Sequence, residues 1–286
     1  MKHIHLYCAT LLAAATTITG CSKKNSNAPE SDSRINNFQV VQTIKSAERD
    51  YSYTGANAVF NDSIPVYSKV SVTIQWPDKM GAFNIKPLQD SLMAAIYESP
   101  KASIDETILA ALEAPRGKDI YKMEPVDSIP TQKLAMTLYN DKIASAVTFN
   151  PNFIVYQVMS SIYDGGAHGM SVSRFINYDF DSARVITPEL AFRPGSDEKL
   201  LDAVKNQLMK MYGVSSLKDL NGKGVFSDQI FLSKEFYLQG YNIVFHYNPY
   251  DIAPYSTGSI DVPVPYYTIS EYLSPEVLRL FASTEI

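Results

Sequence analysis

Apolar and polar residues alternate or cluster along most of the chain in a way that is typical of β-strands. β-Branched and aromatic residues dominate 38–44 and 66–76 in the first half. Such runs are expected for strands that bury one face or both. The second half repeats the pattern, with turn-forming residues such as Asn150-Pro151-Asn152 between the runs. There it predicts strands over 144–149, 153–163, 171–180, 231–238, 242–247 and 259–264.

Apolar residues recur at helical spacing in other segments, and these alternate less regularly with polar ones. Asn84 is a suitable N-cap for the first such segment, and Ser103 followed by Glu106 fits a capping box at the start of the next. Gly213 is a natural stop for a third. The spacing predicts helices over 84–97, 103–112, 198–212 and 271–281.

Runs of strands with the helices segregated from them favour an α+β fold. We expect a mainly antiparallel β-sheet with a few packed helices, in two subdomains. Prolines 115, 125 and 130 interrupt the chain, which places a boundary after residue 130. The expected subdomains are therefore 38–130 and 131–286, the second opening with a segment of unclear type, 131–143.

The first residues are typical of a secretory signal rather than of the folded domain. A short basic start precedes an apolar run over 6–18, which ends in Ile18-Thr19-Gly20-Cys21. This segment resembles a bacterial lipobox, in which the Cys is acylated and becomes the new first residue; the alternative is an ordinary signal peptide. We expect a signal peptide over 1–20 and a lipidated polar tether over 21–37. Ser22 after the Cys favours the outer membrane over the inner one.

Charge and cysteine content narrow the classes of partner. The net charge is −5 and the chain has two cysteines, Cys8 within the signal and Cys21 at the lipidation position. The expected mature domain therefore has no thiol for a disulfide or a thiolate–metal site. An acidic protein is a poor ligand for nucleic acid and a better one for a basic partner. The membrane is then contacted through the N-terminal lipid.

No catalytic arrangement stands out from the spacing of residues. Only His168 and His246 remain after signal removal, and zinc hydrolases commonly use two or three histidines. We expect both to be structural, with no metal and no cofactor. The segment 169–173 lacks the last glycine of a nucleophile elbow. Carboxylates such as Asp164, Asp179 and Glu189 are numerous, and no spacing singles out a pair.

Two stretches have unusual composition. In the first, His168 lies among Gly165, Gly166 and Gly169, which permit positive φ and close backbone approach in a hairpin. The second, 245–267, is rich in tyrosine and proline. Prolines reduce the entropy lost on binding and tyrosines provide rigid contact area. The stretch is either a preorganised recognition surface or a rigid loop with an edge strand.

The tetrapeptide Asp-Ser-Ile-Pro occurs twice, at 62–65 and 127–130. The favoured interpretation is a pair of similar turns, in which Asp bonds its own backbone and Pro blocks continuation. The alternative is that Ser63 and Ser128 are O-glycosylation acceptors.

Three segments in the second half resemble a known family. Tyr163–Gly169, then 177–180 with 186–190, and then Asn248–Tyr255 are similar in sequence and order to the RsiV-like, PdaC-associated domain family. The resemblance covers roughly 144–281. Its members occur in a lysozyme-sensing anti-sigma factor and beside the catalytic domain of a peptidoglycan deacetylase. The resemblance implies an α+β fold and an extracytoplasmic binding role.

The leading hypothesis is a lipid-anchored, non-catalytic binding protein of the bacterial envelope. Its expected partner is a lysozyme-like protein or a peptidoglycan-derived glycan. The alternative is an envelope carbohydrate-active enzyme that uses an unassigned carboxylate pair. The expected binding surface lies where the glycine turn meets the tyrosine-rich loop, with Tyr163, Asp164, His168, Tyr250, Pro254 and Tyr255 as its residues.

Overall fold

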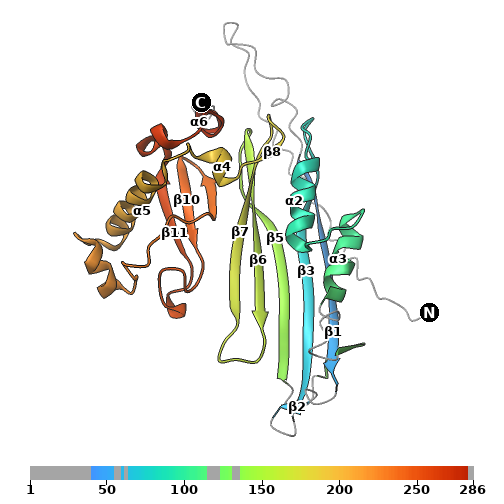
Figure 1. Cartoon of the computed structure of the whole chain (residues 1–286). Helices are drawn as coiled ribbons and strands as arrows, with labels where there is room; N and C mark the ends of the chain where they lie inside the picture. The colour runs from blue at the N-terminus through green and yellow to red at the C-terminus, as the bar shows by residue number, and fades with distance from the viewer. Residues whose placement is uncertain (1–39, 55–58, 61–63, 115–122, 131–135, 283–286) are drawn as a thin grey trace, which may run out of the picture. The chain divides into compact units, whose positions relative to one another are not determined.

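The protein has an α+β fold built on a mostly antiparallel sheet (Figure 1). The computed structural model describes residues 40–54, 59–60, 64–114, 123–130 and 136–282. The predicted signal peptide, Cys21, the tether and Ser63 lie outside these residues. In the part of the chain that the structure describes, no helix is long and apolar enough to cross a bilayer.

Two compact units make up the chain, and each is discontinuous in sequence. The first contains residues up to Ser145 with 162–169 and 180–183, and the second contains 146–161, 170–179 and 184–286. These limits differ from the proline-based boundary after residue 130. The physical reason is that long strands cross between the units: β5 (Met136–Phe149) and β6 (Phe153–Tyr163) each contribute residues to both, and β7 (Met170–Asp179) begins and ends where the chain changes unit.

The strands of the larger sheet follow the order β4-β1-β3-β5-β6-β7-β8 among the described residues, and β2 pairs with β3. β3 and β5 run parallel, whereas β1 is antiparallel to both β3 and β4. The remaining members are β1 (Val40–Tyr53), β2 (Val59–Phe60), β3 (Ile64–Met80), β4 (Met123–Val126) and β8 (Arg184–Val185).

In the first unit, α2 (Lys86–Ile96) and α3 (Ile104–Glu113) pack on the sheet, α3 on both β1 and β3 (Figure 1). The buried Tyr51 hydroxyl donates a hydrogen bond of 2.7 Å to the Leu112 carbonyl, which ties β1 to α3. Ser103 caps α3 as predicted, because its hydroxyl accepts from the Glu106 N–H at 3.2 Å. The N-cap of α2 is Ile85 rather than the predicted Asn84, whose side chain instead accepts from the Lys86 N–H.

The second unit has its own three-stranded antiparallel sheet, in the order β11-β10-β9. α5 (Asp197–Tyr212) packs on β11 and ends at Gly213 in the left-handed conformation, as predicted. The other elements are α4 (Pro188–Ala191), η3 (Leu217–Lys223), β9 (Phe236–Gln239), β10 (Asn242–Tyr247), η4 (Tyr255–Thr257), β11 (Ile260–Pro265), η5 (Tyr266–Thr268), η6 (Ser270–Tyr272) and α6 (Pro275–Ala282).

The core of the second unit lies between its helices and this small sheet. Leu200, Val204 and Leu208 recur at helical spacing on one face of α5 and are buried. They belong to the same buried cluster as Phe245 of β10 and Val262 of β11. The apolar face of α5 is therefore covered by the sheet, as its spacing predicts.

Two predicted elements, β6 and β10, are confirmed at both ends. The segment of unclear type contains the start of β5, which begins at Met136 among the described residues. β9 begins at Phe236 rather than at residue 231, and α6 begins at Pro275 rather than at residue 271. Proline at the first turn of α6 explains the later start, because its fixed φ suits that position and it needs no N–H partner.

Candidate functional site

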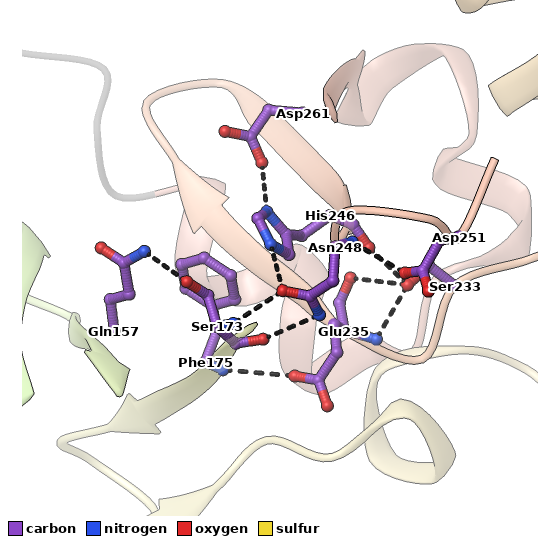
Figure 2. Close-up of polar contacts among 9 residues, drawn as sticks. All are labelled: Gln157, Ser173, Phe175, Ser233, Glu235, His246, Asn248, Asp251 and Asp261. Atoms are coloured by element: carbon purple, nitrogen blue, oxygen red, sulfur yellow. Dashed lines mark hydrogen bonds and ion pairs between the residues drawn. The ribbon is translucent and has the colours of Figure 1, made fainter. Parts of the chain in front are cut away.

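The side chain of Asn248, just after β10, holds the end of this strand against β7. Its Oδ1 accepts from the Ser173 N–H at 2.6 Å, and its Nδ2 donates to the Ser173 carbonyl at 3.2 Å (Figure 2). The amide thus pairs with the backbone of β7 as a neighbouring strand would. On the other side, the Ser173 hydroxyl accepts from Gln157 Nε2 of β6 at 2.8 Å.

The ring of His246 is buried beside Asn248 and is bonded through both nitrogens. Nδ1 lies 2.7 Å from Asp261 Oδ1 of β11, and Nε2 lies 3.2 Å from Asn248 Oδ1. The ring is thus held from two sides, by Asp261 of β11 and by Asn248 just after β10. His246 is 3% exposed, and its structural role stays a prediction.

Further contacts extend this network around the ring. The Ser233 hydroxyl donates to the His246 carbonyl at 2.6 Å, and the Glu235 carboxylate accepts from the Phe175 N–H at 3.3 Å (Figure 2). Asp261 also bonds to the Tyr237 hydroxyl; burial, and then this carboxylate, raise the pKa of Tyr237 to about 12. The network therefore joins β6, β7, β9, β10 and β11 within the second unit.

The network supports a loop that we call the Tyr–Pro loop, residues 248–258. The Asp251 N–H donates to the Asn248 carbonyl at 3.0 Å, and the Asn248 N–H donates to Asp251 Oδ2 at 2.7 Å. Pro249 and Tyr250 occupy the middle of this turn, and Tyr250 has a φ of +75°. A turn of this kind usually has glycine or asparagine at that position.

Tyr250 is displayed rather than buried. It is 51% exposed, and its ring centroid lies 5.6 Å from that of the half-buried Tyr255. Pro254 precedes η4, where the Thr257 N–H donates to the Pro254 carbonyl at 2.9 Å. The structure therefore brings together Tyr250, Pro254 and Tyr255, three of the predicted binding residues, in one hydrogen-bonded loop.

The other predicted residues lie in or beside the glycine turn, residues 164–169, between β6 and β7. His168 and Asp164 are both exposed at this turn, and His168 Nδ1 lies 3.0 Å from the Gly169 carbonyl. The Tyr163 ring lies 5.8 Å from that of Tyr139. The glycine turn belongs to the first unit and the Tyr–Pro loop to the second. A joint surface made by the two remains a prediction.

A pocket of about 250 Å³ lies in the second unit near Glu235. We call it the Glu235 pocket. Burial raises the pKa of the Glu235 carboxyl, against the smaller opposing effects of the Phe175 N–H, Arg174 and His246. The Thr187 hydroxyl, followed by the Glu189 N–H and Lys234, lowers the pKa of Glu189. The lining residues are Phe175, Asn177, Val185, Ile186, Thr187, Pro188, Glu189, Lys234, Glu235 and Phe236.

Other candidates from the sequence have separate surroundings. Asp179 is buried and paired with Arg279 of α6. Ser128 is exposed, and the neighbouring Ile129 N–H donates to Asp50. Within the described ranges, no three His, Cys, Asp or Glu side chains are grouped to hold a metal ion.

Sequence reasoning missed Asn248, Ser173 and Glu235 as parts of one site. Asn248 and Asp251 could have been recognised as the two ends of a turn, since Asn and Asp commonly bond the backbone of such turns. Nothing in the spacing indicates that Ser173 or Glu235 would reach them, because these residues lie in other segments of the chain.

Comparisons with known proteins find a similarity to one family over part of the chain. Residues 192–267, which include β9–β11 and the Tyr–Pro loop, match a family model described as protein of unknown function (DUF3298). No curated protein matches the chain.

Two solved structures have a similar fold. One is a member of the DUF3298 family from Bacteroides fragilis NCTC 9343, with a TM-score of 0.62, 22% identity, and coverage of 87% of this chain and 97% of that one. The other is a DUF3298 family protein from Pseudomonas aeruginosa PAO1, with a TM-score of 0.56, 18% identity, and coverage of 83% and 96%. At these identities the likeness concerns the fold alone.

Proposed function

We propose that the protein is a lipid-anchored binding protein of the bacterial envelope, and that the Tyr–Pro loop is its recognition surface. The proposed partner is a basic, lysozyme-like muramidase or a cell-wall glycan. The RsiV-like resemblance supports this partner class, and the net charge of −5 suits a basic protein. Acylation at Cys21, with the outer membrane favoured, is part of the same proposal.

One observation carries the proposal: Tyr250 has a positive φ and is 51% exposed. A bulky side chain in this conformation costs about 1–2 kcal/mol relative to ordinary backbone. Because the ring is half-exposed, its burial within the protein offsets only a small part of that cost. Residues held in such conformations cluster at binding and active sites, so the geometry favours a role for the ring outside the fold.

The experiment compares binding and melting for matched variants. A pull-down from envelope extract identifies a partner, and its affinity is then measured together with a basic lysozyme and peptidoglycan fragments as defined probes. We expect Tyr250→Ala and Tyr255→Ala to weaken binding by about tenfold or more. Tyr241→Ala is the matched control, because Tyr241 is also 51% exposed and also lies beside a tyrosine, Tyr266.

The same measurement decides the role of His168. If it only stabilises the glycine turn, His168→Ala lowers the melting temperature and leaves affinity unchanged. If it contacts the partner, affinity falls while the melting temperature holds. Wild-type affinity in all three folded variants, Tyr250→Ala, Tyr255→Ala and His168→Ala, places the surface elsewhere.

A second candidate function is an envelope carbohydrate-active enzyme. One observation favours it: Glu189 and Glu235 line one pocket, and their pKa values are moved in opposite directions. Glycoside hydrolysis uses two carboxyls whose surroundings move their pKa values apart. Turnover of peptidoglycan fragments that Glu235→Gln abolishes would establish this function.

A further inference from the structure

We infer that the Glu235 pocket binds a basic side chain, arginine or lysine, presented by a protein partner. This inference rests on the proposed function, which requires a partner, and it specifies that partner as a basic protein rather than a glycan. Three properties of the pocket support it: its size, its remaining polar groups and its charge.

The size and walls of the pocket suit one side chain. Its volume of about 250 Å³ is below the roughly 300–1,000 Å³ of small-molecule sites. Phe175, Pro188 and Phe236 provide apolar walls. Long basic side chains bury their apolar stems against such surfaces while their charged ends reach polar partners.

The neutral polar groups of the pocket are already used within the protein. The Asn177 side chain donates to the Phe236 carbonyl and accepts from the Leu238 N–H, both at 2.9 Å. The Thr187 hydroxyl is bonded to Glu189. A ligand could use these neutral groups only by displacing hydrogen bonds within the protein.

The Glu235 carboxylate retains capacity to accept hydrogen bonds. Among the described residues, the Phe175 N–H is the hydrogen-bond donor to Glu235, through Oε2 at 3.3 Å. An ionised carboxylate has about four acceptor sites. A guanidinium or ammonium group would therefore replace the hydrogen bonds to water that burial of Glu235 has removed. Charge-assisted bonds of this kind are stronger than neutral ones.

Lys234 provides a test of whether the ligand carries a positive charge. It lines the pocket and interacts electrostatically with Glu189. An incoming cation would meet repulsion from Lys234 and Arg174 and attraction from Glu235 and Glu189. Removal of the Lys234 charge should therefore raise affinity for a basic ligand, and removal of the Glu235 charge should lower it. Affinity for a neutral ligand should not follow this pattern.

The experiment titrates the full chain, in detergent micelles, with N-acetylarginine N-methylamide and follows the amide resonance of Phe175. The citrulline analogue is the matched neutral probe, and an N-acetylglucosamine oligomer tests the glycan alternative. We expect the arginine probe alone to bind, Glu235→Gln to weaken it at least about tenfold, and Lys234→Met to strengthen it. Glu198→Gln, an exposed change in α5, is the control.

Equal binding of the citrulline probe, binding of the sugar alone, or no shift at Phe175 would overturn the inference. Melting temperatures establish that each variant is folded, and Lys234→Met tests the charge rule without altering the carboxylate. Partner binding is measured on the same variants. A partner that binds normally to folded Glu235→Gln contradicts this inference only. If envelope extract, lysozyme and peptidoglycan fragments all fail to bind, the proposed function is contradicted.

Discussion

The glycine turn and the Tyr–Pro loop reach unusual backbone conformations by different means. In the glycine turn, Gly165 takes a φ of +91° and Gly169 permits a close approach by Tyr139. In the Tyr–Pro loop, the positive φ belongs to Tyr250, a residue that rarely adopts it. Glycine adopts such a conformation without steric cost, whereas tyrosine does not.

The difference shows where the surrounding structure is needed. The glycine turn obtains its shape from residues that tolerate it. The Tyr–Pro loop obtains its shape from Asn248, which bonds to β7, to His246 and, through its backbone, to Asp251. The loop thus depends on a buried network, and the following changes test that dependence from the largest expected effect to the smallest.

Asn248→Ala should destabilise the protein by about 3 kcal/mol, because it leaves the Ser173 backbone groups and one His246 nitrogen without their partner. Urea unfolding of the purified protein measures this loss. Asn242→Ala at the start of the same strand is the control, with an expected change below about 0.5 kcal/mol. Equal effects of the two substitutions would show that the network does not hold the loop.

Gly169→Ala should destabilise the protein by about 1–3 kcal/mol through overpacking. A Cβ at this position would lie 2.3 Å from the Tyr139 hydroxyl and 3.0 Å from the Ile162 carbonyl. The double variant with Tyr139→Phe should recover part of the loss, because it removes the nearer atom. Thermal unfolding measures both, and a Gly169→Ala variant as stable as the wild type would show that the turn adapts freely.

The fold could be predicted from the sequence more fully than the site. Local signals are enough for β6, β10 and α5, whose periodicity, turn residues and Gly213 are all short-range. The start of β5 at Met136 has no clear pattern. Strand order and the division into units depend on pairings between distant residues, which periodicity does not encode.

The residues of the site could likewise be predicted only where the sequence carries a local signal. Composition alone predicts Tyr250, Pro254 and Tyr255, and the structure places them in one loop. The positive φ of Tyr250 is not predictable, because tyrosine carries no local preference for it. Glu235 was missed because its burial arises from residues in other segments.

Tyr250→Gly should be more stable than Tyr250→Ala by about 1 kcal/mol, because both lack the ring and only glycine accepts the positive φ without strain. Gly165→Ala provides the reverse case and should lose at least this amount, because its Cβ would also lie 2.6 Å from Met136 Cε. Chemical denaturation of the three variants gives the comparison. If Tyr250→Gly and Tyr250→Ala are equally stable, Tyr250 is not strained and the observation that carries the proposed function fails.

The smallest expected effect concerns Glu235 and depends on pH. Burial raises the pKa of this carboxyl above its ordinary value of 4.5. The unfolded chain then ionises first, so the contribution of Glu235 to stability is fully present below pH 4.5 and is lost as pH rises through the folded-state pKa.

Glu235→Gln removes this ionisation while keeping an oxygen that can accept from the Phe175 N–H. We therefore expect the variant to match the wild type in pH dependence below pH 4.5 and to gain relative stability as pH rises above that value. Urea unfolding between about pH 4 and 8 measures the difference, with Glu198→Gln as the exposed control. If the difference in unfolding free energy between the variant and the wild type is constant across this range, Glu235 is not desolvated in the folded protein. The Glu235 pocket would then lose the feature that makes a cation a better occupant than a neutral group.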